Sequence, residues 1–140
     1  MRAIIKRTDE AVGHVEEIRG DLENLQEIVG GYVTCMTYYK DGHPWFAVLC
    51  DDEGMLKMHP VLNCGVRYGS RAQYFVGDIL AVGLGDEDFD DLPEEITIEE
   101  WEKMLVTGKK LMKLIYLPYY DDEDEEDEED EEENDAEVCD

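Results

Sequence analysis

The chain has 140 residues, of which 38 are acidic and 12 are basic, so its formal net charge is −26. This length suits one domain of ordinary size. The charge argues against direct binding of nucleic acid, because contacts to phosphates require a basic surface. No apolar run approaches the ~18 residues of a membrane helix, and the N-terminal apolar segment is too short for a signal peptide, so we expect a cytoplasmic protein without a membrane anchor.

The acidic side chains are unevenly distributed. Sixteen of them, and no basic side chain, lie between Asp121 and the C-terminus. The other 22 share residues 1–120 with all 12 bases, which leaves that part with a net charge of −10. The sequence therefore predicts a globular domain over residues 1–120 and an acidic low-complexity tail over residues 121–140, disordered because so many like charges repel one another.

The first part of the chain predicts two strands and a helix. Residues 2–6 form a short apolar strand, and residues 14–19 form a weaker one. Asp21 is a good N-cap for a helix over residues 22–29, whose apolar residues recur at helical spacing, and Gly30-Gly31 ends this helix.

The middle of the chain predicts a hairpin followed by irregular structure. Residues 32–39 and 45–50 are rich in aromatic and β-branched residues, and the turn residues between them favour a hairpin. A second turn at residues 51–54 leads into residues 55–58. Residues 59–74 are the least periodic stretch of the domain, and we expect a loop there.

The last part of the domain predicts a buried strand over residues 75–83, then an acidic loop and a helix with one apolar face that begins at the capping box Thr97–Glu100. Residues 109–117 fit either a strand or a helix, and the strand is slightly favoured. Together these elements predict an α+β domain with a mainly antiparallel or mixed sheet of about five or six strands and two helices.

The order of these elements resembles the bacterial and phage family known as domain of unknown function 3846. The resemblance spans residues 1–105 and is carried by the opening strand, the junction 25–32 (LQEIVGGY), the segment 52–63 (DEGMLKMHPVLN), expected to be a hairpin tip and strand, and the strand 75–83 (FVGDILAVG). It implies a small domain typical of phages, plasmids and conjugative elements, sometimes encoded near anti-restriction genes. It implies no catalytic residue and no molecular activity, and the acidic tail falls outside the family pattern.

The first candidate binding site is a run of 13 consecutive carboxylates in the tail. Along an extended chain their spacing is close to that of the charges on a single nucleic-acid strand, so they could occupy the phosphate-binding groove of a basic protein. The alternative is a tail that only keeps the protein soluble. The run consists of Asp121, Asp122, Glu123, Asp124, Glu125, Glu126, Asp127, Glu128, Glu129, Asp130, Glu131, Glu132 and Glu133.

A second candidate lies in the expected loop, which concentrates polar and aromatic side chains in an otherwise acidic body. These residues are Asn63, Arg67, Tyr68, Arg71 and Tyr74. Arginine fork donors beside aromatic rings suit a phosphate, a nucleotide or an acidic segment. The alternative is a polar loop whose arginines pair with nearby acids such as Asp78.

No motif specifies catalysis, a metal or a cofactor. Residues 86–91 alternate acids as a calcium loop does, but Asp91 and Thr97 stand where an EF-hand needs glycine and glutamate. The histidines and cysteines show neither a CxxC pair nor a zinc spacing, so we expect reduced thiols, no metal and no cofactor. We therefore expect a protein that is not an enzyme.

Two functional hypotheses remain. The first is a non-catalytic accessory protein of a phage or mobile element that binds a basic, nucleic-acid-binding host protein, in its sharpest form as an acidic nucleic-acid mimic that inhibits a host defence factor. The alternative is a domain that binds or sequesters a nucleotide-type ligand through residues 63–74, with a tail that only solubilises. Independently of both, the exposed strand edges and aromatic residues of the hairpin could form a homodimer, through Tyr32, Tyr38, Tyr39 and Trp45.

Overall fold

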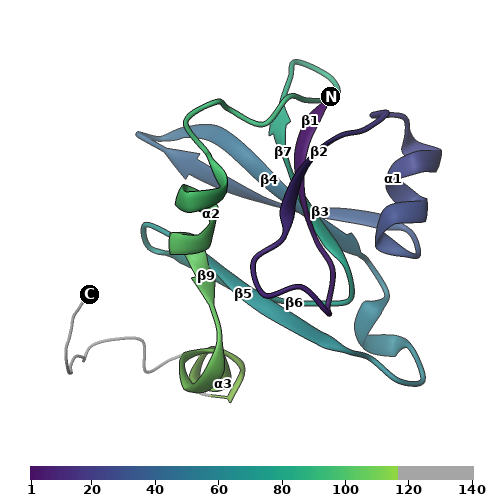
Figure 1. Ribbon diagram of the computed structural model, residues 1–140, viewed down its shortest axis with the longest axis vertical. Helices are drawn as coiled ribbons and strands as arrows, with labels where there is room; N and C mark the ends of the chain where they lie inside the picture. Colours follow the sequence, from purple (N-terminus) through teal and green to yellow (C-terminus); the bar gives the residue numbers. More distant parts are fainter. Residues whose placement is uncertain (117–140) are drawn as a thin grey trace. The chain divides into compact units, whose positions relative to one another are not determined.

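The structure is a computed structural model in which residues 1–116 are described. Residues 1–106 form one compact unit, and the chain from Thr107 onward belongs to a second. The first unit contains two antiparallel sheets, two α-helices and one turn of 3₁₀ helix (Figure 1).

The larger sheet has the strand order β2-β1-β7-β4-β3, and β8 pairs with the end of β7. Its strands are β1 (Arg2–Lys6), β2 (His14–Glu17), β3 (Val33–Lys40), β4 (His43–Asp51), β7 (Ile79–Leu84) and β8 (Phe89–Asp90). The smaller sheet has the order β6-β5-β9, with β5 (Leu62–Tyr68), β6 (Arg71–Val76) and β9 (Leu105–Val106). The helices of this unit are α1 (Leu22–Val29), η1 (Gly54–Leu56) and α2 (Ile98–Met104).

The large sheet is covered on both faces, with α1 on one side and α2 on the other in Figure 1. The cluster it shares with the small sheet and α2 includes Tyr38, Phe46, Val66, Phe75 and Trp101. The cluster it shares with α1 includes Leu25, Val29, Leu49, Leu80 and Val82. A strand covered on both faces needs an unbroken apolar run, which explains the sequence ILAVGL of the central strand β7.

The predicted helix ends are confirmed. The Asp21 side chain accepts a hydrogen bond from the backbone N–H of Asn24 at 3.2 Å, and Gly30 ends α1 in the left-handed conformation, with φ of 83°. The Thr97 hydroxyl accepts from the backbone N–H of Glu100 at 3.2 Å and begins α2. The two side chains satisfy backbone donors at the helix starts, and the Gly30 N–H donates to the Gln26 carbonyl at the end of α1.

The α+β class and the mainly antiparallel pairing are also confirmed, but three local expectations are wrong. The loop expected over residues 59–74 is wrong from Leu62 onward, because β5 and β6 form a hairpin there. The strand expected within residues 52–63 is replaced by η1 and an irregular segment that ends at Leu62. The larger sheet has the expected six strands, but the separate three-stranded sheet of β5, β6 and β9 was not expected.

In the second unit, the favoured strand over residues 109–117 is wrong. Gly108–Tyr116 forms the helix α3, whose first turn is closed by a hydrogen bond from Leu111 N–H to the Thr107 carbonyl at 3.4 Å. Apolar Leu111, Leu114 and Ile115 recur at helical spacing, and the lysines of α3 occupy other positions. None of the helices within residues 1–116 is long and apolar enough to cross a lipid bilayer.

Candidate functional site

Asn63, the first residue predicted to bind a ligand, joins three segments of the fold. Its side-chain nitrogen donates to the backbone carbonyls of Lys6, at 3.0 Å, and of Gly77, at 2.8 Å. Its side-chain oxygen accepts from the Lys6 ammonium at 2.6 Å. These bonds tie β5 to β1 and to the turn before β7, so the Asn63 amide serves the fold.

The other four residues of this candidate lie on two opposite faces of the β5–β6 hairpin. Tyr68 pairs across the strands with Arg71, so both share one face; Arg67 and Tyr74 lie on the other. The Arg71 guanidinium contacts the sulfur of Met36, and the Tyr68 ring packs 5.1 Å from that of Trp45. The hairpin therefore does not gather the predicted residues into one pocket.

Asp78, the acid expected beside these arginines, is bound by the connection that follows β1. Its two carboxylate oxygens accept from the backbone N–H of Thr8, at 3.0 Å, and from the Arg7 guanidinium, at 3.4 Å. This contact holds the start of β7 against the segment after β1. Asp78 thus has a structural role that the expected pairing did not foresee.

The aromatic residues proposed for a homodimer are divided between the core and the surface. Tyr38 is fully buried, and its hydroxyl donates to the backbone carbonyl of Val66 at 2.8 Å. Burial raises the pKa of this hydroxyl, which stays protonated as a donor. Trp45 packs internally against Phe46, whereas Tyr32 and Tyr39 are exposed. The homodimer stays a prediction. Tyr39 lies in the edge strand β3, and Tyr32 immediately precedes that strand.

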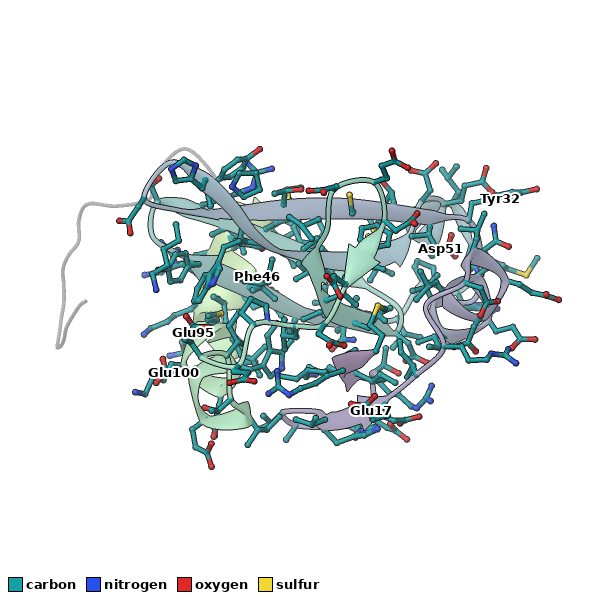
Figure 2. The ribbon with its side chains drawn as sticks, turned by 90° about the horizontal axis from the view of Figure 1, so that it is seen from above. Glu17, Tyr32, Phe46, Asp51, Glu95 and Glu100 are labelled. Carbon is teal, nitrogen blue, oxygen red and sulfur yellow. The ribbon has the colours of Figure 1, made fainter. Side chains whose placement is uncertain are left out.

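The most highly charged surface of the first unit lies over the β7–β8 turn, the following loop and α2. We call it the acidic face, and its exposed carboxylates are Asp86, Glu87, Asp88, Asp90, Asp91, Glu94, Glu95, Glu99, Glu100 and Glu102. Lys103, which follows Glu102 in the chain, pairs with Glu100 at 3.2 Å. Ten carboxylates in 17 residues therefore stand at one end of the sheets, where Figure 2 labels Glu95 and Glu100.

Arg2 holds the loop of the acidic face in place. Its backbone N–H donates to the Asp91 carboxylate at 2.7 Å, and its guanidinium donates to the carbonyls of Leu92, Pro93 and Ile96 at 3.0–3.2 Å. Five donors fixed on one guanidinium suit such a fan of carbonyl acceptors. Arg2 thus anchors the backbone of this loop between Asp91 and Ile96, a feature that sequence reasoning missed.

A buried carboxylate lies at the opposite end of the sheets, where Figure 2 labels Asp51 and Tyr32. The Asp51 side chain is 4% exposed, and its Oδ1 accepts from the backbone N–H of Glu53 at 3.0 Å. Its carboxylate lies directly against Gly31, where an added Cβ would overlap it. The cross-strand pairing of Asp51 with Val33, two residues after Gly31, brings these groups together.

Lys57 is the cationic neighbour of this carboxylate. Its ammonium lies 3.0 Å from Asp51 Oδ2 and donates to the Gly30 carbonyl at 2.7 Å. The contact with Oδ2 lacks hydrogen-bond direction, so this oxygen receives no hydrogen bond from any residue that the structure describes. The two charges are therefore close together, but the buried oxygen Oδ2 of Asp51 still lacks a hydrogen-bond donor within the described chain.

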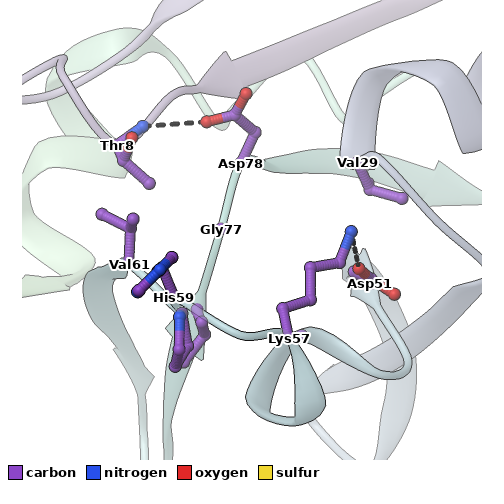
Figure 3. Close-up of a pocket in the computed structure, with 11 residues that line it drawn as sticks. Thr8, Val29, Asp51, Lys57, His59, Val61, Gly77 and Asp78 are labelled. Carbon is purple, nitrogen blue, oxygen red and sulfur yellow. Dashed lines mark hydrogen bonds and ion pairs between the residues drawn. The ribbon is translucent and has the colours of Figure 1, made fainter.

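Two hollows open beside this ion pair, and both are lined by Asp51 and Lys57. Figure 3 shows the one that also includes Thr8 and Asp78. One, of about 200 Å³, extends towards Thr8, Val61 and Asp78. The other, of about 350 Å³, extends towards Gln26, Tyr32 and Glu53. Most wall residues come from the segments 25–32 and 51–63, and residues 8 and 76–78 complete the first hollow. The glycine pair followed by an aromatic residue, and the acidic turn, were therefore the sequence signals of this site.

The cysteines of the described chain are free thiols. Burial raises the pKa of Cys50, helped by Asp51, and that of Cys64, each to about 11, so both remain protonated at neutral pH. No three His, Cys, Asp or Glu side chains within residues 1–116 are grouped to hold a metal ion. Cys139 and the carboxylate run Asp121–Glu133 lie outside the described residues, and the role of that run stays a prediction.

A family model described as Domain of unknown function (DUF3846) matches residues 1–106. This range coincides with the first structural unit, and it contains both the acidic face and the Asp51 site. A comparison with curated proteins found no match, and neither did one with solved structures.

Proposed function

The chain belongs to the DUF3846 family, whose description assigns no activity, and we propose from its surface that it binds a basic partner protein and is not an enzyme. In its sharpest form the proposal is an accessory protein of a phage or mobile element. It would occupy the nucleic-acid-binding groove of a host factor, such as a defence nuclease, and inhibit it. The observation that carries this proposal is the acidic face.

The acidic face has the electrostatic properties that such a role requires. The side chains of Glu94, Glu95, Glu99 and Glu102 make no hydrogen bond or ion pair within residues 1–116, so a partner does not have to break internal contacts to reach them. Like charges fixed close together produce a strong local field, which accelerates association with a basic surface and makes it sensitive to salt. Arg2 keeps the loop of this face in position before binding, so little ordering entropy is lost there.

The tail extends the same charge pattern in sequence. Its 13 consecutive carboxylates follow a body that already has a net charge of −10. A partner with a long basic groove would bind the acidic face and the tail together, and two linked contacts bind more tightly than either alone. The two contributions are separable, because the tail can be deleted without touching any residue of the first unit.

The nucleotide-type ligand has less support. The Asn63 amide is engaged within the fold, and Arg67 and Tyr74 do not share a face with Tyr68 and Arg71. The hollows instead contain the buried Asp51 carboxylate, which repels an anion. Native mass spectrometry of the freshly purified protein, with a thermal-shift panel of nucleotides, would reveal such a ligand if it existed.

Affinity capture from a nuclease-treated host lysate tests the proposal. We expect a basic nucleic-acid-binding protein to be retained at low salt, released at high salt and displaced by added duplex DNA. A partner that is acidic, or whose retention is indifferent to salt and DNA, would contradict it. The same capture with residues 121–140 deleted assigns the contribution of the tail: equal retention would exclude the tail as the effector and leave the acidic face.

A further inference from the structure

The Asp51–Lys57 pair is unequal, because its anion is buried and its cation is not. The Asp51 side chain is 4% exposed, whereas that of Lys57 is 52% exposed. A carboxylate removed from water requires a nearby cation, and the cost of leaving it unpaired is large. Asp51 therefore needs a positive charge at this place, but the fold does not require that charge to be Lys57.

The oxygens that receive the cation are held by the backbone. Gly30 is the left-handed residue that ends α1, and its carbonyl accepts from the Lys57 ammonium at 2.7 Å. Asp51 is held by the Glu53 N–H and by close contact with Gly31. Two fixed oxygens thus lie within about 3 Å of one nitrogen atom, and one of them, Oδ2, lacks a directed donor.

The charges around both hollows favour a cation. The first is lined by Asp51 and by Asp78, which already pairs with Arg7, and the second is lined by Asp51 and Glu53. In each hollow Lys57 is the single ammonium among the lining residues. If the Lys57 side chain rotated into the solvent, the positive group of a ligand could replace its ammonium, with two carboxylates nearby.

The rim of the site is unusually apolar for a surface. Large hydrophobic side chains are 54–88% exposed there, namely Tyr32, Met55, Leu56, Met58 and Val61. Of these, Tyr32 lines one hollow and Val61 lines the other. Exposed apolar residues gathered in this way mark protein-binding surfaces, and methionines adapt their shape to a partner.

We propose that this site binds an arginine side chain of a partner protein, flanked by apolar residues, with Lys57 as the internal cation that the arginine displaces. A guanidinium presents several donors in a fixed fork, so it can donate to Asp51 Oδ2 and to the Gly30 carbonyl at once. The apolar neighbours of the arginine pack on the rim. The site lies at the other end of the sheets from the acidic face (Figure 2), and it does not depend on the proposed function.

A titration of the full-length, ¹⁵N-labelled protein with capped tripeptides, followed by NMR, tests the proposal. The probe has arginine between two leucines; its matched control has citrulline, which is neutral and nearly the same shape. We expect the arginine peptide to shift the amide signals of Gly30 and Gly31, with that of Gly69 in the distant β5–β6 turn unchanged. We expect Kd for the citrulline peptide to be at least about tenfold larger. Equal binding of the two peptides would overturn the proposal.

Variants of the pair provide the second test. Lys57→Met removes the competing ammonium and keeps an apolar stem, so we expect Kd for the arginine peptide to fall by about tenfold; Asp51→Asn should abolish binding. Lys103→Met, which removes an exposed ammonium at the acidic face, should change nothing. Weaker binding by Lys57→Met would mean that Lys57 itself holds the ligand, and would overturn the proposal. If either variant at the pair fails to fold, the comparison of arginine with citrulline in the unaltered protein decides.

Discussion

Asn63→Ala should be one of the most damaging single substitutions in this protein, because the Asn63 amide joins β5 to β1 and to the turn before β7. The change removes two hydrogen bonds to backbone carbonyls and one from an ammonium. That ammonium belongs to Lys6, which is 3% exposed, so its charge would lose one of its two acceptors inside the fold.

The expected loss is about 2–4 kcal/mol in the free energy of unfolding. Each neutral hydrogen bond contributes about 1 kcal/mol net, and one to a charged group about 1.5–3 kcal/mol. We expect less than the largest total of these three contributions, because Asn63 is only partly buried and water can replace some of the lost hydrogen-bond partners.

Urea unfolding measures this effect as a shift of the midpoint at an unchanged m-value. The matched control is Asn24→Ala, which removes one exposed side-chain hydrogen bond, to the Arg19 carbonyl, and should cost less than about 1 kcal/mol. If Asn63→Ala costs no more than the control, the reasoning is refuted and the Asn63 amide becomes available again for the ligand role.

Three further substitutions test other parts of the structure. Gly31→Ala should destabilise the protein by about 1–3 kcal/mol in a urea titration, because its Cβ would overlap the Asp51 carboxylate, whereas Gly54→Ala meets only ordinary contacts at 3.4–3.7 Å and should be nearly neutral. Tyr38→Phe should cost about 0.5–1.5 kcal/mol by the same assay, since a buried backbone carbonyl loses its donor. Hydrogen bonds from His14 to Glu16 and to Glu10 raise the pKa of His14 above 6.5. The stabilising effect of His14 should therefore be complete below about pH 6.5 and disappear as pH rises through the folded pKa. A constant difference in unfolding free energy between the unaltered protein and His14→Gln, from about pH 5.5 to about pH 8.5, would contradict this.

The parts of the fold with strong local signals could be predicted. Asp21 and Gly30 fix the two ends of α1 through their own side-chain and backbone chemistry, and Thr97 does the same for α2. Strand β7 was recognisable because both of its faces are buried and its sequence is apolar throughout. The single strand expected over residues 75–83 is nevertheless divided, because β6 ends at Val76 and β7 begins at Ile79.

The β5–β6 hairpin was missed although its alternation is present. Cys64, Val66 and Tyr68 point to one face of β5, with Gly65 and Arg67 between them. Glycine and arginine weaken the strand propensity of such a segment, and pairing with neighbouring strands supplies what propensity does not. In α3 the residue types and the spacing conflict: Ile115 and Tyr116 favour a strand, whereas the apolar spacing of residues 111–115 is helical, and the helix forms.

The sites depend on contacts between segments far apart in the chain, which a single sequence does not display. The acidic face was visible as a run of acids, but its anchoring by Arg2 joins residues 90 positions apart. Asp51 meets Gly31 only because the β3–β4 register pairs it with Val33. Register is set by packing and turn geometry together, so the Asp51 site could not be built from its residue types.

The most direct test of the account compares two variants of equal net charge in binding to the captured partner. One neutralises Glu94, Glu95, Glu99 and Glu102 of the acidic face; the other neutralises four exposed acids elsewhere, namely Glu23, Glu27, Asp41 and Asp52. If the acidic face binds the partner, Kd of the first variant rises by about tenfold or more at about 0.1 M salt and its salt dependence flattens, while the second stays within about twofold of the unaltered protein. Equal losses in both variants, or none in the first, would contradict the account.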